Sequence, residues 1–258
     1  MTVDAKKSSE QRPAKSPLAN NRNFIFDDRK RFVFVFVPKV ACTNWKSILR
    51  YMAGHEDYLD NRLAHDRKNG GLHYLDLSGP EIDIVNDPTI PKYSFIRDPY
   101  SRALSAYLNK VESRIDRLNE DDPSDHFLTV TREIDNFRKA QMDVALHPVI
   151  DFEVFLQFLL SSGHYFRNDE HWVSQTSLLG WPHVKYDFIG RFETLRFDSA
   201  EILRRIGCDI PFPSHKEVNF PATGANDRLG TYLTPACARL VEQIYSADFD
   251  NFSYPRRG

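Results

Sequence analysis

The sequence contains few cysteines, and none of them belongs to a closely spaced pair. Cys42, Cys208 and Cys237 are the three cysteines among 258 residues, and no C-x-x-C motif joins any two of them. Disulfide-stabilised domains and structural zinc sites need more cysteines at short, regular spacings. The pattern therefore argues against both and favours a reducing compartment, so we expect a cytoplasmic protein without a structural metal.

Long apolar runs and an excess of one charge are also lacking. The longest apolar run covers residues 32–37, whereas a membrane-spanning helix needs about 20 apolar residues. Residues 1–23 contain no apolar stretch typical of a secretory signal. The formal net charge of −2 gives no global positive field that would attract nucleic acid. We therefore expect a soluble protein with no transmembrane segment and no nucleic-acid partner.

The composition indicates a polar tail followed by one folded domain. Residues 1–23 are polar and contain two prolines, which is typical of a disordered tail. Over the whole chain, hydrophobic residues make up 41% and include 19 Phe, enough to build a core. We expect a single domain over residues 24–258.

Two strand–loop–helix units stand out in the apolar pattern. Residues 31–37 are apolar almost throughout, which predicts a strand buried on both faces. The apolar residues that follow recur at helical spacing from Thr43 until Gly54, a residue that commonly ends helices. Residues 93–96 predict a second strand, followed by a helix over 99–115. This helix has Asp98 as its N-cap and Pro99 as its first residue, both favourable choices.

The remaining chain shows weaker signals. The pattern predicts no long helix over 55–91, exposed helix and loop over 112–143, a helix from Asp151 to near Gly163, a strand over 187–192, a helix from Asp198 to Gly207, and a last helix opened by Thr234 and Pro235.

The loop of the first unit, PKVACTNWK (38–46), has the parts of a phosphate-binding site. Backbone N–H groups at a helix N-terminus attract anions. Lys39 adds a positive charge and Thr43 adds a hydroxyl donor. No glycine occurs in this loop, so it is not the Walker loop of ATPases. An ATP-dependent kinase is therefore a weak alternative.

The second unit carries RDPYSRALSAY (97–107), with Arg97 at the end of the predicted strand and Ser105 on the helix. A guanidinium group is planar and can bind two phosphate oxygens at once. Together with a hydroxyl on the helix, it makes a clamp for a phosphate monoester.

Both motifs resemble those of the carbohydrate sulfotransferases, in the branch that contains the chondroitin 4-sulfotransferases and the HNK-1 sulfotransferase. In these enzymes the first loop binds the 5′-phosphosulfate of 3′-phosphoadenosine 5′-phosphosulfate (PAPS), and the second motif binds its 3′-phosphate. Three later segments resemble the same branch in the same order: Glu170–Trp172, Tyr186–Leu195 and Asp248–Tyr254. The chain departs from the family at residues 178–181, where paired cysteines usually stand.

The resemblance implies an α/β fold, a P-loop-like three-layer sandwich with a central parallel sheet flanked by helices. It also implies a sulfotransferase that transfers a sulfuryl group from PAPS to a hydroxyl of a carbohydrate or glycolipid acceptor, with no metal. Membrane contact would be peripheral, through a lipid-linked acceptor, and the oligomeric state stays open. A protein that binds PAPS or its product PAP without transferring the group is the main alternative.

The resemblance assigns cofactor contacts to both motifs. Lys39 would contact the 5′-phosphate and the bridging oxygen, and Arg97 and Ser105 would hold the 3′-phosphate. Trp45 either packs by the adenine or belongs to the core stripe of its helix. The cofactor-binding residues expected from the first loop are Lys39, Val40, Ala41, Cys42, Thr43, Asn44 and Trp45.

Other roles are less closely specified by the sequence. The general base is expected between the two motifs, where His73 and then His65 are the candidates, with a structural role as the alternative for each. Thr223 and Arg228 lie in a loop that would close over the nucleotide. Glu170 and His171 would either orient the acceptor or serve the structure.

Overall fold

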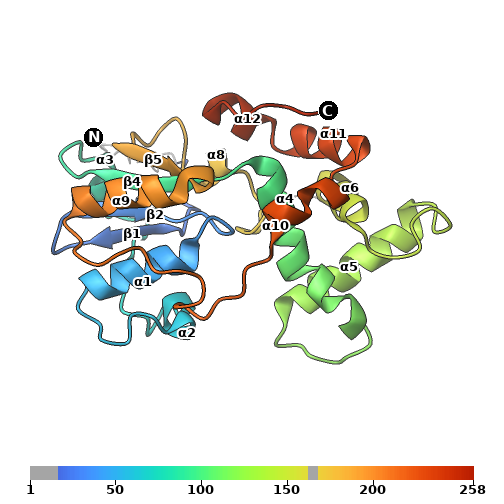
Figure 1. Ribbon diagram of the computed structural model, residues 1–258, viewed down its shortest axis with the longest axis horizontal. Helices are drawn as coiled ribbons and strands as arrows, with labels where there is room; N and C mark the ends of the chain where they lie inside the picture. Colours follow the sequence, from blue (N-terminus) through green and yellow to red (C-terminus); the bar gives the residue numbers. More distant parts are fainter. Residues whose placement is uncertain (1–16, 162–167) are drawn as a thin grey trace, which may run out of the picture.

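The described residues form one five-stranded sheet, which lies in the left half of Figure 1. The computed structural model describes residues 17–161 and 168–258. The strands follow the order β3-β1-β2-β4-β5 across the sheet. Their bounds are β1 Phe24–Asp27, β2 Phe32–Val35, β3 His73–Tyr74, β4 Lys92–Ile96 and β5 Phe188–Arg191.

Helices flank the sheet and extend beyond it. In Figure 1, α1 and α9 lie along the sheet, whereas α5, α6 and α11 gather on the far side of α4. The bounds are α1 Cys42–Met52, α2 Asn61–His65, α3 Ile82–Asn86, α4 Pro99–Lys110, η1 Glu112–Arg117, α5 His126–Gln141, α6 Phe152–Ser161, α8 Gln175–Leu178, η2 Phe192–Thr194, α9 Leu195–Ile206, α10 Ala225–Tyr232, α11 Pro235–Ile244 and α12 Ser246–Phe252. In the described ranges, no helix combines the length and the apolar character that crossing a bilayer requires.

The prediction of a central sheet flanked by helices is confirmed, but the sheet is mixed. β2, β4 and β5 are parallel to one another, as predicted. β1 is antiparallel to both β2 and β3. β1 is not predicted from the sequence, because four residues between a polar stretch and a charged turn give too short an apolar signal.

The two predicted strand–loop–helix units are present. β2 is fully buried, and α1 follows it after a short loop, with Gly54 in the left-handed region at φ 88° just past the helix. In the second unit, the Asp98 side chain accepts a hydrogen bond from the Ser101 amide at 2.9 Å, which confirms the predicted N-cap. α4 ends at Lys110, five residues before the predicted end.

Three further predictions need correction. Residues 17–23 were assigned to the tail, yet Leu18 is buried and the side chains of Asn21 and Asn23 donate hydrogen bonds to the Leu178 carbonyl. α9 begins at Leu195, not at Asp198, whose carboxylate instead accepts a hydrogen bond from the Arg191 amide. α5 buries an apolar face, so the 112–143 segment is not simply exposed. The predicted helix end at Gly163 and residues 1–16 of the predicted tail lie outside the described residues.

Candidate active site

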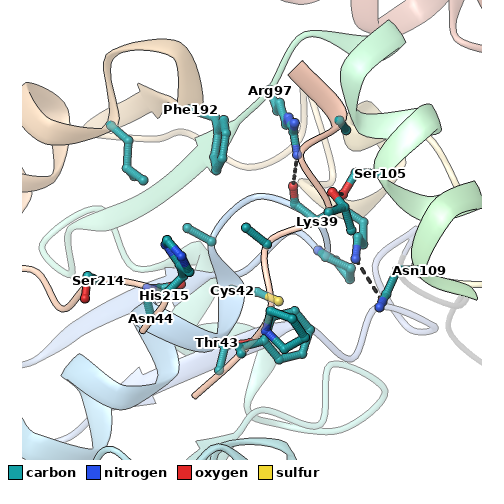
Figure 2. A pocket seen from close by; sticks show the side chains of 18 of the residues that line it. Lys39, Cys42, Thr43, Asn44, Arg97, Ser105, Asn109, Phe192, Ser214 and His215 are labelled. Atoms are coloured by element: carbon teal, nitrogen blue, oxygen red, sulfur yellow. Dashed lines mark hydrogen bonds between the residues drawn. The ribbon is translucent and has the colours of Figure 1, made fainter. Parts of the chain in front are cut away.

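The two predicted motifs line one cavity of about 1090 Å³ (Figure 2). The β2–α1 loop forms its floor, and α4 contributes a row of polar side chains. Residues 211–215 and 220–227, which run from the α9–α10 connection into the first turn of α10, also line it. Ligand pockets commonly have volumes of ~300–1,000 Å³. This cavity therefore has room for a nucleotide and part of a second molecule.

The β2–α1 loop turns sharply before the helix begins. Lys39 and Ala41 both adopt positive φ angles, 69° and 51°, which are rare for residues other than glycine. The first intrahelical hydrogen bond joins the Trp45 amide to the Ala41 carbonyl at 3.1 Å. The amides of Cys42, Thr43 and Asn44 therefore have no preceding helical carbonyl to bind. These amides, together with the partial positive charge of the helix N-terminus, suit an anion.

Lys39 places a cation beside this helix terminus. Its Nζ donates a hydrogen bond to Asn109 Oδ1 on α4 at 2.9 Å. Burial, together with the neighbouring cations Lys110, Arg97 and Arg102, lowers the pKa of Lys39 to about 7. An anion bound in the cavity would offset this effect and favour the protonated amine.

Arg97 links the two motifs directly. Its side chain is buried and donates to the Lys39 carbonyl at 3.0 Å, and also to Asn226 Oδ1 at 2.6 Å. The guanidinium lies 4.3 Å from the centre of the Phe192 ring. Burial lowers the pKa of Arg97 to about 10, so the group is still charged at neutral pH.

The 211–227 segment closes over both motifs. Asn44 donates to the Pro213 carbonyl at 2.8 Å, and the hydroxyls of Ser105 and Thr223 are 3.0 Å apart. Arg97 and Ser105, the two predicted phosphate contacts, thus hydrogen bond to side-chain oxygens of this segment. Such oxygens occupy positions that phosphate oxygens could take.

A sequence model of the Sulfotransferase family matches residues 22–255. The chain belongs to this family. It is 30% identical over 239 residues to carbohydrate sulfotransferase 14 of Homo sapiens, covering 91% of this chain and 60% of that protein. It is 28% identical over 247 residues to carbohydrate sulfotransferase 11 of Rattus norvegicus, covering 90% of this chain and 67% of that protein. The chain thus spans about three fifths of the length of the first of these relatives. No solved structure matches it.

Most of the cofactor contacts predicted for this chain lie at the cavity. The structure places Lys39, Ala41, Cys42, Thr43, Asn44, Arg97, Ser105 and Thr223 along its wall. Val40 and Trp45 were expected to contact the cofactor, but they do not line the cavity. The Val40 amide bonds to the Val37 carbonyl and its side chain is buried. Trp45 is fully buried and stacks on Phe34, so the core interpretation is right and its ring cannot contact adenine.

The prediction that Arg228 closes over the nucleotide is wrong. Arg228 is on α10 outside the cavity lining, and its guanidinium pairs with Glu112 at 3.3 Å and packs on Tyr232. The segment is helical from Ala225 onward, and Arg228 lies on the side of α10 that faces η1. Asn226, which the sequence analysis did not single out, is the residue of this helix that reaches Arg97.

The two candidate bases have different positions. His65 lines the cavity, where its Nε2 lies 2.9 Å from the Thr43 hydroxyl. His73 is on the edge strand β3, where it pairs with Glu81 at 2.7 Å and packs on Phe26. It lines a different, smaller pocket. The structure therefore removes His73 as a candidate base, because the strand carries it along the sheet edge and away from the β2–α1 loop.

The sequence analysis missed three residues of the site. Phe192 lines the cavity against Arg97, Asn109 binds Lys39, and Gln175 holds the backbone of Arg97 from both sides. The spacing of Asn109, one turn after Ser105 on the same helix, was the one available signal. The other two come from segments far along the chain, which no local pattern relates to Arg97.

Proposed function

We propose that this protein transfers a sulfuryl group from PAPS to a hydroxyl of a carbohydrate acceptor. The observation that carries the proposal is the meeting of the two phosphate motifs in one cavity, with the Arg97 guanidinium bonded to the Lys39 carbonyl. The β2–α1 loop and the Arg97 side chain would be two anion sites that lie next to each other. This arrangement suits one nucleotide with phosphates on both its 5′ and 3′ sides. The names of the relatives support a carbohydrate as the acceptor.

The residues of the cavity fit the parts of PAPS. Arg97 and Ser105 would hold the 3′-phosphate, and the α1 N-terminus with Thr43 would hold the 5′-phosphate. Phe192, Leu195 and Phe212 line the adjoining wall and offer apolar surface for the adenine. The P-loop-like, three-layer form of the fold is part of this proposal, since β2, its loop and α1 would then act as the phosphate-binding unit.

Lys39 would serve the reaction itself. PAPS supplies the sulfuryl group on a phosphate leaving group, and charge develops on the bridging oxygen as the bond breaks. An ammonium group held there stabilises this charge without moving. The remaining task is removal of a proton from the acceptor hydroxyl.

The opposite end of the cavity is available for the acceptor. α4 rises about 1.5 Å per residue, so Lys110 lies roughly 16 Å along the helix from Pro99, next to Arg97. Lys110, Glu170, His171 and His65 line this end. We propose that the carbohydrate or glycolipid enters here. A cytoplasmic location stays a prediction. The three free cysteines support it.

PAP should raise the melting temperature of the protein, whereas ATP with magnesium should not. At 100 times its Kd, a ligand stabilises the folded state by about 2.7 kcal/mol. For a domain of this size, that corresponds to roughly 5–10 °C. Differential scanning fluorimetry with PAP, ATP-magnesium and AMP tests this expectation. A shift with ATP-magnesium alone would instead support the kinase alternative.

PAP affinity should fall as the pH rises above about 7. The pKa of Lys39 is about 7 in the ligand-free protein, and bound phosphate raises it, so binding takes up a proton above pH 7. Calorimetry in two buffers with different ionisation enthalpies measures the proton uptake. In Lys39→Arg the guanidinium stays charged, so the uptake should disappear. Proton uptake that persists in Lys39→Arg would contradict the assignment to Lys39.

Transfer itself is tested with sulfur-labelled PAPS and a panel of acceptors. The panel should include desulfated chondroitin, neutral oligosaccharides and a lipid-linked sugar. Tight PAP binding with no label on any acceptor would favour the alternative of a binding protein without transferase activity.

A further inference from the structure

Three side chains at the acceptor end of the cavity are able to take up a proton. His65, Glu170 and His171 all line this region. A general base needs a free lone pair, a fixed orientation and a way to stabilise the charge it acquires. The contacts of the three groups differ in these respects.

His65 and Glu170 are already engaged with neighbouring groups. His65 Nε2 bonds to the Thr43 hydroxyl, and burial together with Lys46 and Lys110 lowers the pKa of His65 to about 4. Such an imidazole is a weak base. A carboxylate oxygen of Glu170 pairs with Arg67 at 3.2 Å, so this group is already engaged in an ion pair.

His171 has a carboxylate partner that fixes its orientation. Asp169 Oδ1 lies 2.8 Å from His171 Nδ1 and 2.9 Å from the His171 amide nitrogen. A carboxylate can only accept, so Nδ1 carries the hydrogen and Nε2 has the lone pair. The ring is also packed against Phe127, with 5.0 Å between ring centres.

The charges around His171 come from several elements. Lys110 faces it from α4 and His65 from α2, while Asp169 and Glu170 belong to its own segment. His126 on α5 lies 3.8 Å from the second oxygen of Asp169. Burial lowers the pKa of His171, and the hydrogen bond to Asp169 acts in the opposite direction. The imidazole is therefore neutral at neutral pH, and Asp169 stabilises the imidazolium that forms on protonation.

We propose that His171 is the general base of this sulfotransferase and that Asp169 is its positioning residue. His171 Nε2 takes the proton of the acceptor hydroxyl as the acceptor oxygen forms its bond to sulfur. The bond between sulfur and the bridging oxygen breaks, and its electron pair stays on the 5′-phosphate of PAP beside Lys39. This assignment rests on the proposed function and places the base outside the segment between the two phosphate motifs.

Replacement of His171 by glutamine tests the proposal. We expect turnover to fall by about 100-fold or more, on the scale of general-base catalysis, with PAP affinity by calorimetry unchanged. Turnover is measured as label transferred to the best acceptor of the panel, and as labelled sulfate released from PAPS to water. His183→Gln, the same change at an exposed histidine outside the cavity, should match the wild type in both.

The pH dependence of turnover separates a positioning role of Asp169 from a structural one. Without the carboxylate, the imidazolium is less stable and the pKa of His171 falls. In Asp169→Asn, the acid limb of the pH–rate profile should therefore move to lower pH, while the plateau drops by about 10-fold or more. NMR titration of the His171 ring in the same variant should show the same direction of shift.

Two results would overturn the assignment of the base. One is wild-type turnover in His171→Gln. The other is an equal loss of PAP affinity and turnover in that variant, which would indicate a structural role. Both leave the proposed function intact, because the wild type would still bind PAP and transfer the label. Failure of the wild type to bind PAP would overturn the proposed function itself, and the base with it.

Discussion

Replacing Lys39 by alanine is expected to lower PAPS-dependent transfer by about 100-fold to 1,000-fold. This is the effect of removing one preorganised group that stabilises charge on an oxygen in the transition state. Lys39 lies two residues before Ala41, the N-cap of α1, and its Nζ is held by the hydrogen bond to Asn109. Because Arg97 and Ser105 would still bind the 3′-phosphate, PAP affinity should fall much less than turnover. Steady-state kinetics with labelled PAPS, together with PAP titration by calorimetry, measures both quantities.

Lys185→Ala is the matched control for this experiment. Lys185 is exposed and does not line the cavity, so its removal changes the net charge equally without touching the site. It should retain wild-type turnover. If Lys39→Ala keeps turnover within about 3-fold of the wild type, Lys39 does not stabilise the leaving group, and the proposed geometry of transfer is wrong.

The sequence was sufficient to predict the two strand–loop–helix units that carry the motifs, because each is a local pattern. In parallel strands the carboxyl ends lie on the same edge of the sheet, so Lys39 and Arg97 could be expected to meet. The bond between them bears this out. The same local reasoning predicted the N-cap at Asp98 and the burial of Trp45 as one of two alternatives.

The errors arose where position depends on contacts between distant segments. His73 lies between the two motifs in sequence, but its strand pairs with β1 at the sheet edge, so it is not near the β2–α1 loop. β1 itself is short and was missed. Gln175 reaches Arg97 from a segment that follows α6, and no spacing in the sequence relates that segment to Arg97.

A buried carboxylate on α12 holds this distant segment in place. Asp248 is fully buried and accepts hydrogen bonds from the amides of Gln175 and Thr176 and from the Thr176 hydroxyl. Gln175 in turn accepts a hydrogen bond from the Arg97 amide at 2.9 Å and donates one to the Arg97 carbonyl at 2.8 Å. Asp248 thus positions the end of β4 through Gln175. It does so although it lies far from Arg97 in sequence and does not line the cavity.

Asp248→Ala is therefore expected to lower the free energy of unfolding by about 3–5 kcal/mol. The substitution leaves two amides and a hydroxyl without their partner in a site that water does not reach, and hydrogen bonds to charged groups contribute ~1.5–3 kcal/mol each. Urea unfolding followed by circular dichroism measures the change. Asp248→Asn keeps one acceptor oxygen, so its loss should be smaller, at about 1–3 kcal/mol.

The matched control for the stability change is Asp250→Ala on the same helix. Asp250 is exposed and forms a surface ion pair with Arg256, and such pairs contribute about 0–1 kcal/mol. If Asp248→Ala and Asp250→Ala prove equally stable, the carboxylate does not hold α8.

A folded Asp248→Ala should also bind PAP at least about 10-fold more weakly at low temperature, because Gln175 would no longer fix the backbone of Arg97. Unchanged PAP affinity in this variant would show that Arg97 is positioned by its other contacts alone.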